Sequence, residues 1–199
     1  MSKKPELVII AGPNGSGKTT ITKQLLSHTW AQDCLYINPD DIAENEFGSW
    51  NLPEASLKAA QKAQMLREEC LRERRSLVFE TVFSATDKIG YIERAISAGY
   101  FVRLFFICTD SPEINIARIE RRKRKGGHGV PRDKIISRFG KSIWNCGVAI
   151  SFVDRAYIYD NSVQDADPRI LFRTQNGAVV KIYCDSFNDW VKPIYQEVW

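Results

Sequence analysis

The chain has 199 residues, a net charge of +4, 44% hydrophobic residues and 26% charged residues. This length and composition predict one compact domain over residues 1–199, and they argue against long disorder and against a strongly basic nucleic-acid-binding protein. The five cysteines form no CxxC pair, so we expect neither a disulfide framework nor structural zinc. No signal peptide or membrane-spanning run is recognisable, so we expect a cytoplasmic protein with no membrane partner.

Strands and helices are predicted to alternate from the start of the chain. Leu7–Ala11 is a continuous apolar run, typical of a parallel strand that is buried on both faces. A glycine-rich turn and a helix from about Lys18 to Ser27 follow, and then a short strand at Leu35–Asn38. Pro53–Arg75 has the pattern of a long amphipathic helix, and Leu77–Phe79 that of a third strand.

The alternation continues to the middle of the chain. Lys88–Ala98 is predicted as a helix that Gly99 ends, and Phe101–Cys108 as a fourth strand. Ser111-Pro112-Glu113 is typical of a helix start, with Ser111 as the N-cap and proline in the first turn. This helix runs into the basic segment Arg118–Lys125.

The last third is predicted to contain a helix, a strand and a hairpin. The helix begins at Pro131-Arg132-Asp133 and reaches about Ile150, and the fifth strand is Arg155–Tyr159. Asn176-Gly177 between two β-prone runs, Ile170–Thr174 and Ala178–Tyr183, is a strong hairpin signal. A short terminal helix with Trp190 and Trp199 is expected to pack on the body.

This order of elements predicts an α/β fold of the P-loop NTPase, kinase-like class. We expect a mainly parallel sheet with helices on both faces and a C-terminal β-hairpin. Ligands of such sheets bind beyond the carboxyl ends of the strands. The phosphate-loop candidate, Asp40, Glu80-Thr81, Thr109-Asp110 and Asp160-Asn161 should therefore gather at one rim.

The turn Gly12–Thr19 matches the phosphate-loop motif GxxxxGK[ST] in full, between an apolar strand and a helix. Its glycines let backbone N–H groups wrap a phosphate, and the helix N-terminus adds a positive dipole. Lys18 is expected to reach the β- and γ-phosphates of ATP, and the Thr19 hydroxyl to bind Mg²⁺. The predicted nucleotide-binding residues are Gly12, Pro13, Asn14, Gly15, Ser16, Gly17, Lys18, Thr19 and Thr20.

Three polar positions follow the predicted strands, each with a structural alternative. Asp40 or Asp41 could accept the proton of a substrate hydroxyl, or one of them could cap a helix. Glu80 could lie near Mg²⁺ or bind substrate, or it could cap the next helix. Thr81 and Ser84 could donate hydrogen bonds to substrate, or they could be turn residues.

The basic segment Arg118–Lys125 has two interpretations. As a lid, its arginines would clamp the γ-phosphate and stabilise the charge that is transferred. Otherwise it is a solvated helix face or a nucleic-acid-binding patch. We favour the lid, because Gly126–Gly129 provides a hinge directly after it.

The chain resembles the short, stand-alone members of the zeta toxin family of P-loop kinases, over Leu7 to about Ser162. The resemblance lies in the motifs GPNGSGKTT, INPDDIA, FET, GY, GGHGVP and YDNS, in this order. It implies ATP- and Mg²⁺-dependent phosphorylation of a small-molecule acceptor, UDP-N-acetylglucosamine, at a sugar hydroxyl. It also brings an antitoxin protein into consideration as a partner.

The resemblance assigns roles to particular residues. It implies that Asp40 is the base and that Glu80 and Thr81 bind substrate, although the larger toxins separate such a pair by one residue. Lid arginines clamp the phosphates in this family, which points to Arg122 and to Arg138, the first residue of an Arg-Phe pair. The predicted catalytic residues are therefore Asp40, Lys18, Arg122 and Arg138, and the predicted metal-binding residues are Thr19 and Glu80.

Three other functions stay open at this point. The same scaffold serves kinases of other metabolites and of nucleic-acid ends. A non-transferring ATPase is a second alternative, although the chain lacks the LSGGQ-like signature of transporter ATPases. A nucleic-acid-binding module that uses Arg118–Lys125 is the third, and it would leave the phosphate loop unexplained.

Overall fold

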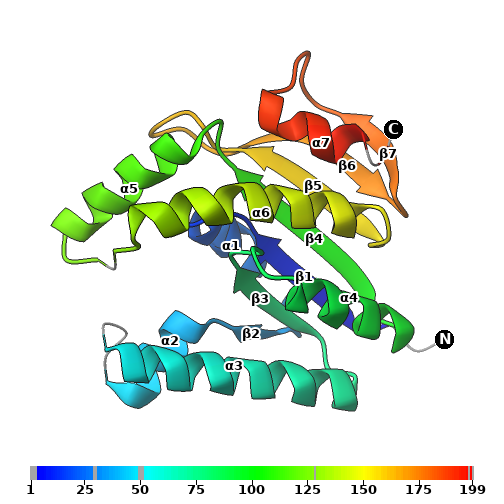
Figure 1. Cartoon of the computed structure of the whole chain (residues 1–199). Helices are drawn as coiled ribbons and strands as arrows, with labels where there is room; N and C mark the ends of the chain where they lie inside the picture. Colours follow the sequence, from blue (N-terminus) through cyan, green and yellow to red (C-terminus); the bar gives the residue numbers. More distant parts are fainter. Residues whose placement is uncertain (1–3, 29–30, 49–51, 128, 197, 199) are drawn as a thin grey trace.

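All seven strands of the computed structural model form one sheet, in the order β2-β3-β1-β4-β5-β6-β7 (Figure 1). The pairs from β2 to β5 are parallel, and β6 and β7 are added antiparallel. The strands are β1 (Glu6–Ala11), β2 (Leu35–Ile37), β3 (Leu77–Thr81), β4 (Phe101–Cys108), β5 (Arg155–Asp160), β6 (Arg169–Gln175) and β7 (Ala178–Ile182). The structure describes residues 4–28, 31–48, 52–127, 129–196 and 198.

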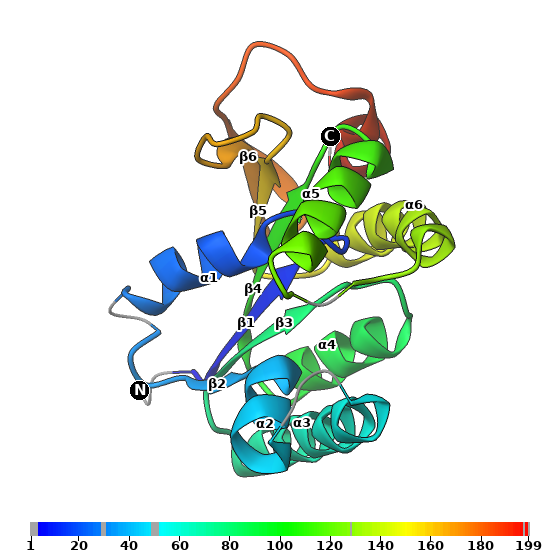
Figure 2. The ribbon, with the colours of Figure 1, turned by 90° about the vertical axis from the view of Figure 1, so that its left-hand side faces the viewer.

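Helices cover both faces of the sheet. Figure 2 shows the sheet nearly edge-on, with α1 on one side and α3, α4 and α6 on the other. The helices are α1 (Lys18–Leu26), α2 (Pro39–Phe47), α3 (Pro53–Glu73), α4 (Asp87–Ser97), α5 (Pro112–Arg124), α6 (Arg132–Ile150), the 3-10 helix η1 (Asp189–Val191) and α7 (Lys192–Gln196). The predicted α/β class, the mainly parallel sheet and the terminal hairpin are thereby confirmed.

The central strand β1 shows why the sequence folds in two layers around the sheet. All six of its residues are buried. Leu7 and Ile9 belong to the large core on the α3, α4 and α6 side, whereas Val8 and Ile10 pack with Ile21 of α1 on the other. A strand that is apolar at every position can be buried only in this way, between two layers of helices.

Two local expectations were wrong in detail. Asp40 and Asp41 are not N-caps: they lie in the first turn of α2, and Asn38 caps this helix through its side chain. The third strand does not end at Phe79 but includes Glu80 and Thr81, which pair with the end of β1. Glu80 is therefore not a cap of α4, since that helix is preceded by Thr86.

The other predicted boundaries agree with the structure to within a few residues. The second strand ends at Ile37, one residue earlier than predicted, because Asn38 is the cap of α2. Trp190 is buried in the core, as expected. His128 of the glycine-rich stretch and Trp199 lie outside the described residues.

The β6–β7 hairpin provides a test of the fold. Gly177 has φ +77°, and a Cβ atom there would lie 2.3 Å from the carbonyl oxygen of Ser151. We expect Gly177→Ala to lower the free energy of unfolding by about 1–3 kcal/mol, because it adds a backbone clash to an unfavourable φ angle. Urea denaturation measures the change.

Gly48→Ala is the matched control for this substitution. Gly48 has a similar φ of +70°, but a Cβ atom there would meet nothing within 4 Å. Gly48→Ala should lower the free energy of unfolding by only about 1 kcal/mol, since only the backbone conformation is unfavourable for alanine. Equal losses in the two variants would contradict the packing of this hairpin against the end of α6.

Candidate active site

The phosphate loop follows β1 at the carboxyl edge of the sheet. Gly15 and Gly17 adopt φ angles of +79° and +94°, which only glycine adopts readily. A Cβ atom on Gly17 would also lie 2.2 Å from the side-chain nitrogen of Asn161. That nitrogen donates a hydrogen bond to the carbonyl oxygen of Ser16, 2.8 Å away. The loop is thus held from the end of β5, a contact that the motif alone did not predict.

The ammonium group of Lys18 lies inside this loop. Its Nζ atom donates hydrogen bonds to the carbonyl oxygens of Gly12 and Pro13, at 2.8 and 2.9 Å. Burial lowers the pKa of Lys18 from 10.5 to about 8, and the nearby Glu80 partly opposes this shift. The loop therefore holds a positive charge that has lost most of its contact with water. An anionic ligand bound in the loop would compensate for this loss.

This pKa makes nucleotide binding dependent on pH. A bound phosphate would keep Lys18 protonated, so we expect ATP affinity to fall as the pH rises through about 8, by up to about tenfold per pH unit. Titration with a fluorescent ATP analogue from about pH 7 to about pH 9 measures the slope. Lys18→Arg is the control, because a guanidinium group stays protonated throughout this range. Constant affinity in the wild-type protein would contradict the pKa.

The same pKa has the opposite consequence for the unliganded fold. Between pH 8 and 10.5 the unfolded chain keeps a proton on Lys18 that the folded chain has released. The unfolded state binds more protons in this range, so the contribution of this group to stability rises with pH.

The carboxylate of Glu80 lies on the α1 side of the sheet. Its Oε1 atom accepts hydrogen bonds from the Thr22 hydroxyl at 2.7 Å and from the Tyr36 hydroxyl at 2.9 Å. Thr81 is the next residue of β3, so its side chain points to the other face, and its hydroxyl accepts a bond from the backbone N–H of Phe83. The structure therefore does not bring Glu80 and Thr81 together on one face.

The two aspartates after β2 lie on α2. The backbone N–H of Asp40 donates to the side-chain oxygen of Asn38, at 3.0 Å, and both aspartates are exposed. The carboxyl group of Asp41 is nevertheless partly shielded from solvent, and this desolvation, followed by the charges of Asp40 and Glu80, raises its pKa. Asp40 in turn is close enough to favour the charged form of Lys18. The Asp40 carboxylate is thus close to the phosphate loop.

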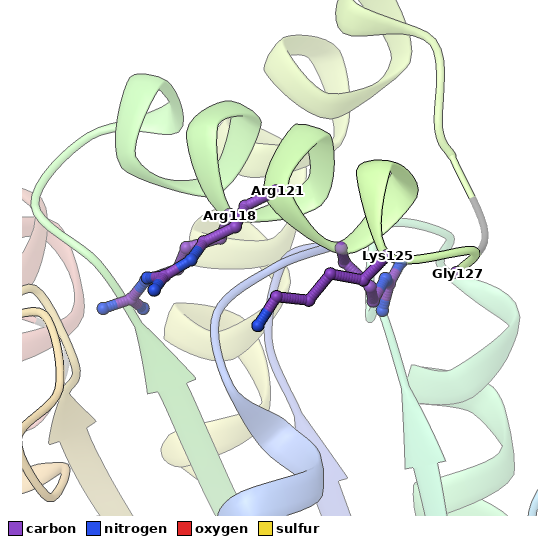
Figure 3. A pocket seen from close by; sticks show the side chains of 5 residues that line it. Arg118, Arg121, Lys125 and Gly127 are labelled. Carbon is purple, nitrogen blue, oxygen red and sulfur yellow. The ribbon is translucent and has the colours of Figure 1, made fainter.

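Helix α5 carries the predicted lid arginines above the loop. Figure 3 shows Arg118, Arg121 and Lys125 projecting from α5 on the side of the phosphate loop and α1. Together with Arg122 and Gly127 they line a pocket of about 310 Å³. The charge of Arg122 also acts on Lys18, in the direction that lowers its pKa. The lid interpretation of the basic segment therefore agrees with its position.

Arg138 reaches the loop from a different helix. It lies on α6, and its Nη1 atom donates to the side-chain oxygen of Asn14, 3.3 Å away. The two arginines singled out from the sequence thus approach the phosphate loop from α5 and α6.

A larger pocket of about 720 Å³ lies beside the loop, between α5 and the segment after β5. Its lining residues are Gly17, Thr20, Ile114, Ala117, Arg118, Arg121, Arg124, Asn161, Ser162, Val163, Gln164, Asp165 and Ala166. Asn161 was expected at the rim without a particular role, and residues 163–166 were not predicted to take part. The polar YDNS motif at the end of a predicted strand was the sequence feature that could have indicated this side of the pocket.

Several buried polar atoms around the loop have no hydrogen-bond partner among the residues that the structure describes. They include the Ser16 hydroxyl in the loop and one guanidinium nitrogen of Arg118 beside the larger pocket. Together with the glycine cradle and Lys18, these donors fit the phosphates of a nucleotide. Among the described residues, no three His, Cys, Asp or Glu side chains are gathered as in a protein-only metal site. Mg²⁺ bound mainly through phosphates and water needs no such cluster.

A parallel sheet with this phosphate loop after its first strand and an arginine-rich helix above the loop defines a P-loop protein of the kinase-like class. The family model of the zeta toxins matches residues 1–177, and the chain belongs to the zeta toxin family. An uncharacterized protein of Haemophilus influenzae is 29% identical over 134 residues, which are 66% of this chain and 91% of that protein.

Solved structures share the fold at low sequence identity. A chain of the AvrRxo1-ORF1:AvrRxo1-ORF2 complex with ATP is 19% identical over 98% of this chain, with a TM-score of 0.67. A chain of the PezAT chromosomal toxin–antitoxin system of Streptococcus pneumoniae is 16% identical over 99% of this chain and 79% of its own length, with a TM-score of 0.65. A putative kinase from Chloroflexus aurantiacus is 19% identical over 68% of this chain and 77% of its own length, with a TM-score of 0.51. This chain spans only 63% of the length of the AvrRxo1 chain.

Family and fold together support a nucleotide-binding P-loop protein of the phosphotransferase type. In the part of the chain that the structure describes, no helix combines the length and the apolar character that crossing a membrane requires.

Proposed function

We propose that the protein is an ATP-dependent kinase that phosphorylates a hydroxyl group of a small molecule, with Asp40 as the general base. One observation carries this proposal. The Lys18 ammonium group lies inside the phosphate loop, where it donates to the carbonyl oxygens of Gly12 and Pro13. Glu80, Arg122 and Asp40 are near enough to influence its pKa. These groups come from β3, α5 and α2, which supports a site that three elements build around the phosphate loop.

The roles follow from the chemistry of phosphoryl transfer. The Asp40 carboxylate takes the proton of the acceptor hydroxyl, the hydroxyl oxygen forms a bond to the γ-phosphorus, and the bond to the ADP oxygen breaks. Lys18 and Arg122 stabilise the negative charge on the transferred group and on the leaving ADP. Mg²⁺, when bound, neutralises further phosphate charge, and Thr19 and Glu80 are its proposed protein contacts.

We propose UDP-N-acetylglucosamine as the acceptor, on the basis of membership in the zeta toxin family. The basic residues of α5 exceed what one triphosphate needs, which suits an acceptor with its own diphosphate. Thr81 and Arg138 are proposed contacts of substrate and phosphate from the α6 side of the sheet. All five cysteines are free thiols, which suits the cytoplasm as the place of the reaction.

An antitoxin protein is a proposed partner of this chain. The proposal rests on the family and on the PezAT system, which is described as a toxin–antitoxin system.

Arg122→Ala should lower the rate of transfer far more than it weakens ATP binding. A lid arginine acts mainly on charge that develops in the transition state, so we expect a fall in kcat of about 10²-fold and a change in ATP affinity of about threefold or less. Steady-state kinetics and nucleotide titration measure the two effects. Lys123→Ala is the control, because it removes the same charge from α5 at an exposed position that lines neither pocket. Equal effects of the two substitutions would contradict a specific role of Arg122.

A panel of acceptors with γ-labelled ATP tests the proposed function. The panel contains UDP-N-acetylglucosamine, UDP-glucose and an RNA with a free 5′-hydroxyl end. Label in the amino-sugar nucleotide supports the proposal, whereas label only in the RNA end would assign the protein to nucleic-acid kinases. ATP hydrolysis without any labelled acceptor would favour the non-transferring ATPase.

A further inference from the structure

We propose that Tyr36 is a positioning residue that ties the base Asp40 to the phosphate-loop helix through a chain of hydrogen bonds. The inference rests on the proposed function, because it takes Asp40 as the base. The chain runs from Thr22 on α1 through Glu80, Tyr36 and Asn38 to the backbone of Asp40.

The direction of each bond in the chain follows from the protons that are available. The only proton of the Tyr36 hydroxyl goes to Oε1 of Glu80, at 2.9 Å, since a carboxylate can only accept. The hydroxyl oxygen then accepts from the side-chain nitrogen of Asn38, at 3.1 Å. This orients the Asn38 amide so that its oxygen faces the N–H of Asp40, at 3.0 Å. The hydroxyl of Tyr36, together with the Asp41 carboxylate that also hydrogen-bonds the Asn38 side chain, therefore selects the amide orientation that caps α2.

The other end of this chain of hydrogen bonds lies beside Lys18. Thr22 is buried, and its hydroxyl lies 2.7 Å from Oε1 of Glu80 and 3.1 Å from the carbonyl oxygen of Lys18. Its single proton is best used by the carboxylate, because that acceptor is charged and nearer. Thr22 stands one helical turn after Lys18, so the chain connects the element that holds the phosphate-binding lysine to the element that holds the base.

Helix α2 needs such a tether. Ala43 is its single buried residue, and Ile42 packs partly against the core. Glu46 pairs with Lys62 of α3 near the other end of the helix. None of these contacts orients the first turn. The cap at Asn38 fixes the first turn, which is where Asp40 lies. Burial and the charge of Glu80 raise the pKa of Tyr36, so its hydroxyl remains a donor throughout the physiological range.

These hydrogen bonds also determine which carboxylate oxygen of Glu80 is available to a ligand. Both hydroxyl groups bind Oε1, and none of the described hydrogen bonds uses Oε2. Oε2 is therefore the oxygen that would be available to a ligand in the proposed reaction. Loss of the Tyr36 hydroxyl would leave the Glu80 carboxylate free to rotate, and it would leave the Asn38 side chain that caps α2 free to reorient.

Tyr36→Phe tests the inference, since it keeps the ring and removes only the hydroxyl. We expect kcat to fall roughly ten- to a hundredfold and the KM for ATP to stay within about twofold, because misplacing a base costs rate and the nucleotide contacts are unchanged. Tyr157→Phe is the matched control. Tyr36 and Tyr157 both pack against the small core on the α1 side, but the Tyr157 ring stacks on Phe105 away from the chain of hydrogen bonds. Equal rates for the two variants would overturn the inference.

A double-mutant cycle with Asp40→Asn separates positioning from a general loss of structure. If Tyr36 acts through Asp40, then Tyr36→Phe should leave the residual rate of Asp40→Asn unchanged, measured with labelled ATP at high enzyme concentration. A further fall of the same size in the Asp40→Asn background would overturn the inference.

Hydrogen exchange provides a readout that needs no acceptor. Tyr36→Phe should speed exchange of the Asp40 amide about tenfold relative to wild type, and Tyr157→Phe should not. If the wild-type protein transfers phosphate to no acceptor, the proposed function fails, while this exchange still decides whether Tyr36 holds the first turn of α2. Unchanged exchange in Tyr36→Phe would overturn the positioning role.

Discussion

Lys18→Ala should abolish phosphoryl transfer and weaken ATP binding at least about tenfold. The substitution removes the ammonium group that lies inside the phosphate loop, where it donates to the carbonyl oxygens of Gly12 and Pro13. Without it, those carbonyl dipoles would face the phosphates with no charge between them. Titration with a fluorescent nucleotide and a labelled-phosphate assay measure the two losses.

The control for this prediction is Lys23→Ala on the same helix. Lys23 lies on α1 and is exposed, so its removal changes the net charge equally without altering the loop. We expect the control to keep wild-type turnover. Wild-type turnover in Lys18→Ala itself would be incompatible with a nucleotide bound on Gly12–Thr19.

Asp40→Asn should collapse transfer by about 10²–10⁴-fold while ATP affinity stays within about threefold. An asparagine side chain has nearly the same size as aspartate but cannot accept the acceptor proton. The N–H of Asp40 that meets the Asn38 cap belongs to the backbone, so the substitution leaves the start of α2 intact. Rates at saturating ATP, together with nucleotide affinity, separate the two effects.

Asp41→Asn is the matched comparison, one residue further along α2. Loss of solvent around its carboxyl group and the charges of Asp40 and Glu80 raise the pKa of Asp41, whereas Asp40 lies near enough to Lys18 to favour its charged form. We expect its substitution to reduce the rate by less than about tenfold. A silent Asp40→Asn beside a damaging Asp41→Asn would exchange the roles of the two carboxylates.

Local signals accounted for much of the fold. The phosphate loop is recognisable because its glycines, lysine and threonine act within one turn of chain, and Asn176-Gly177 marks a hairpin for a similar reason. Helix α2 was not predicted as an element. It has nine residues and buries only Ala43, so it lacks the apolar stripe by which helices are recognised.

The contacts of the site were predictable only in part. Glu80 was singled out, but its partners Thr22 and Tyr36 are 58 and 44 residues away in sequence, and no spacing rule links them. Asn161 was placed at the correct rim, yet its bond to the phosphate loop spans 145 residues. By contrast, the opposite orientations of Glu80 and Thr81 follow from strand alternation once the strand is known to include both. What could not be predicted are contacts that arise only when the sheet assembles.

The most direct test of the central claim is mass spectrometry of UDP-N-acetylglucosamine after incubation with ATP, Mg²⁺ and the protein. Wild-type protein should add the mass of one phosphoryl group to the sugar part of the molecule, and fragmentation should locate it on a ring hydroxyl. Under the same conditions Asp40→Asn should form this product at least about 10²-fold more slowly. Unmodified UDP-N-acetylglucosamine beside a phosphorylated RNA end or another phosphorylated metabolite would contradict the proposed acceptor. Equal product from both proteins would contradict the role of Asp40.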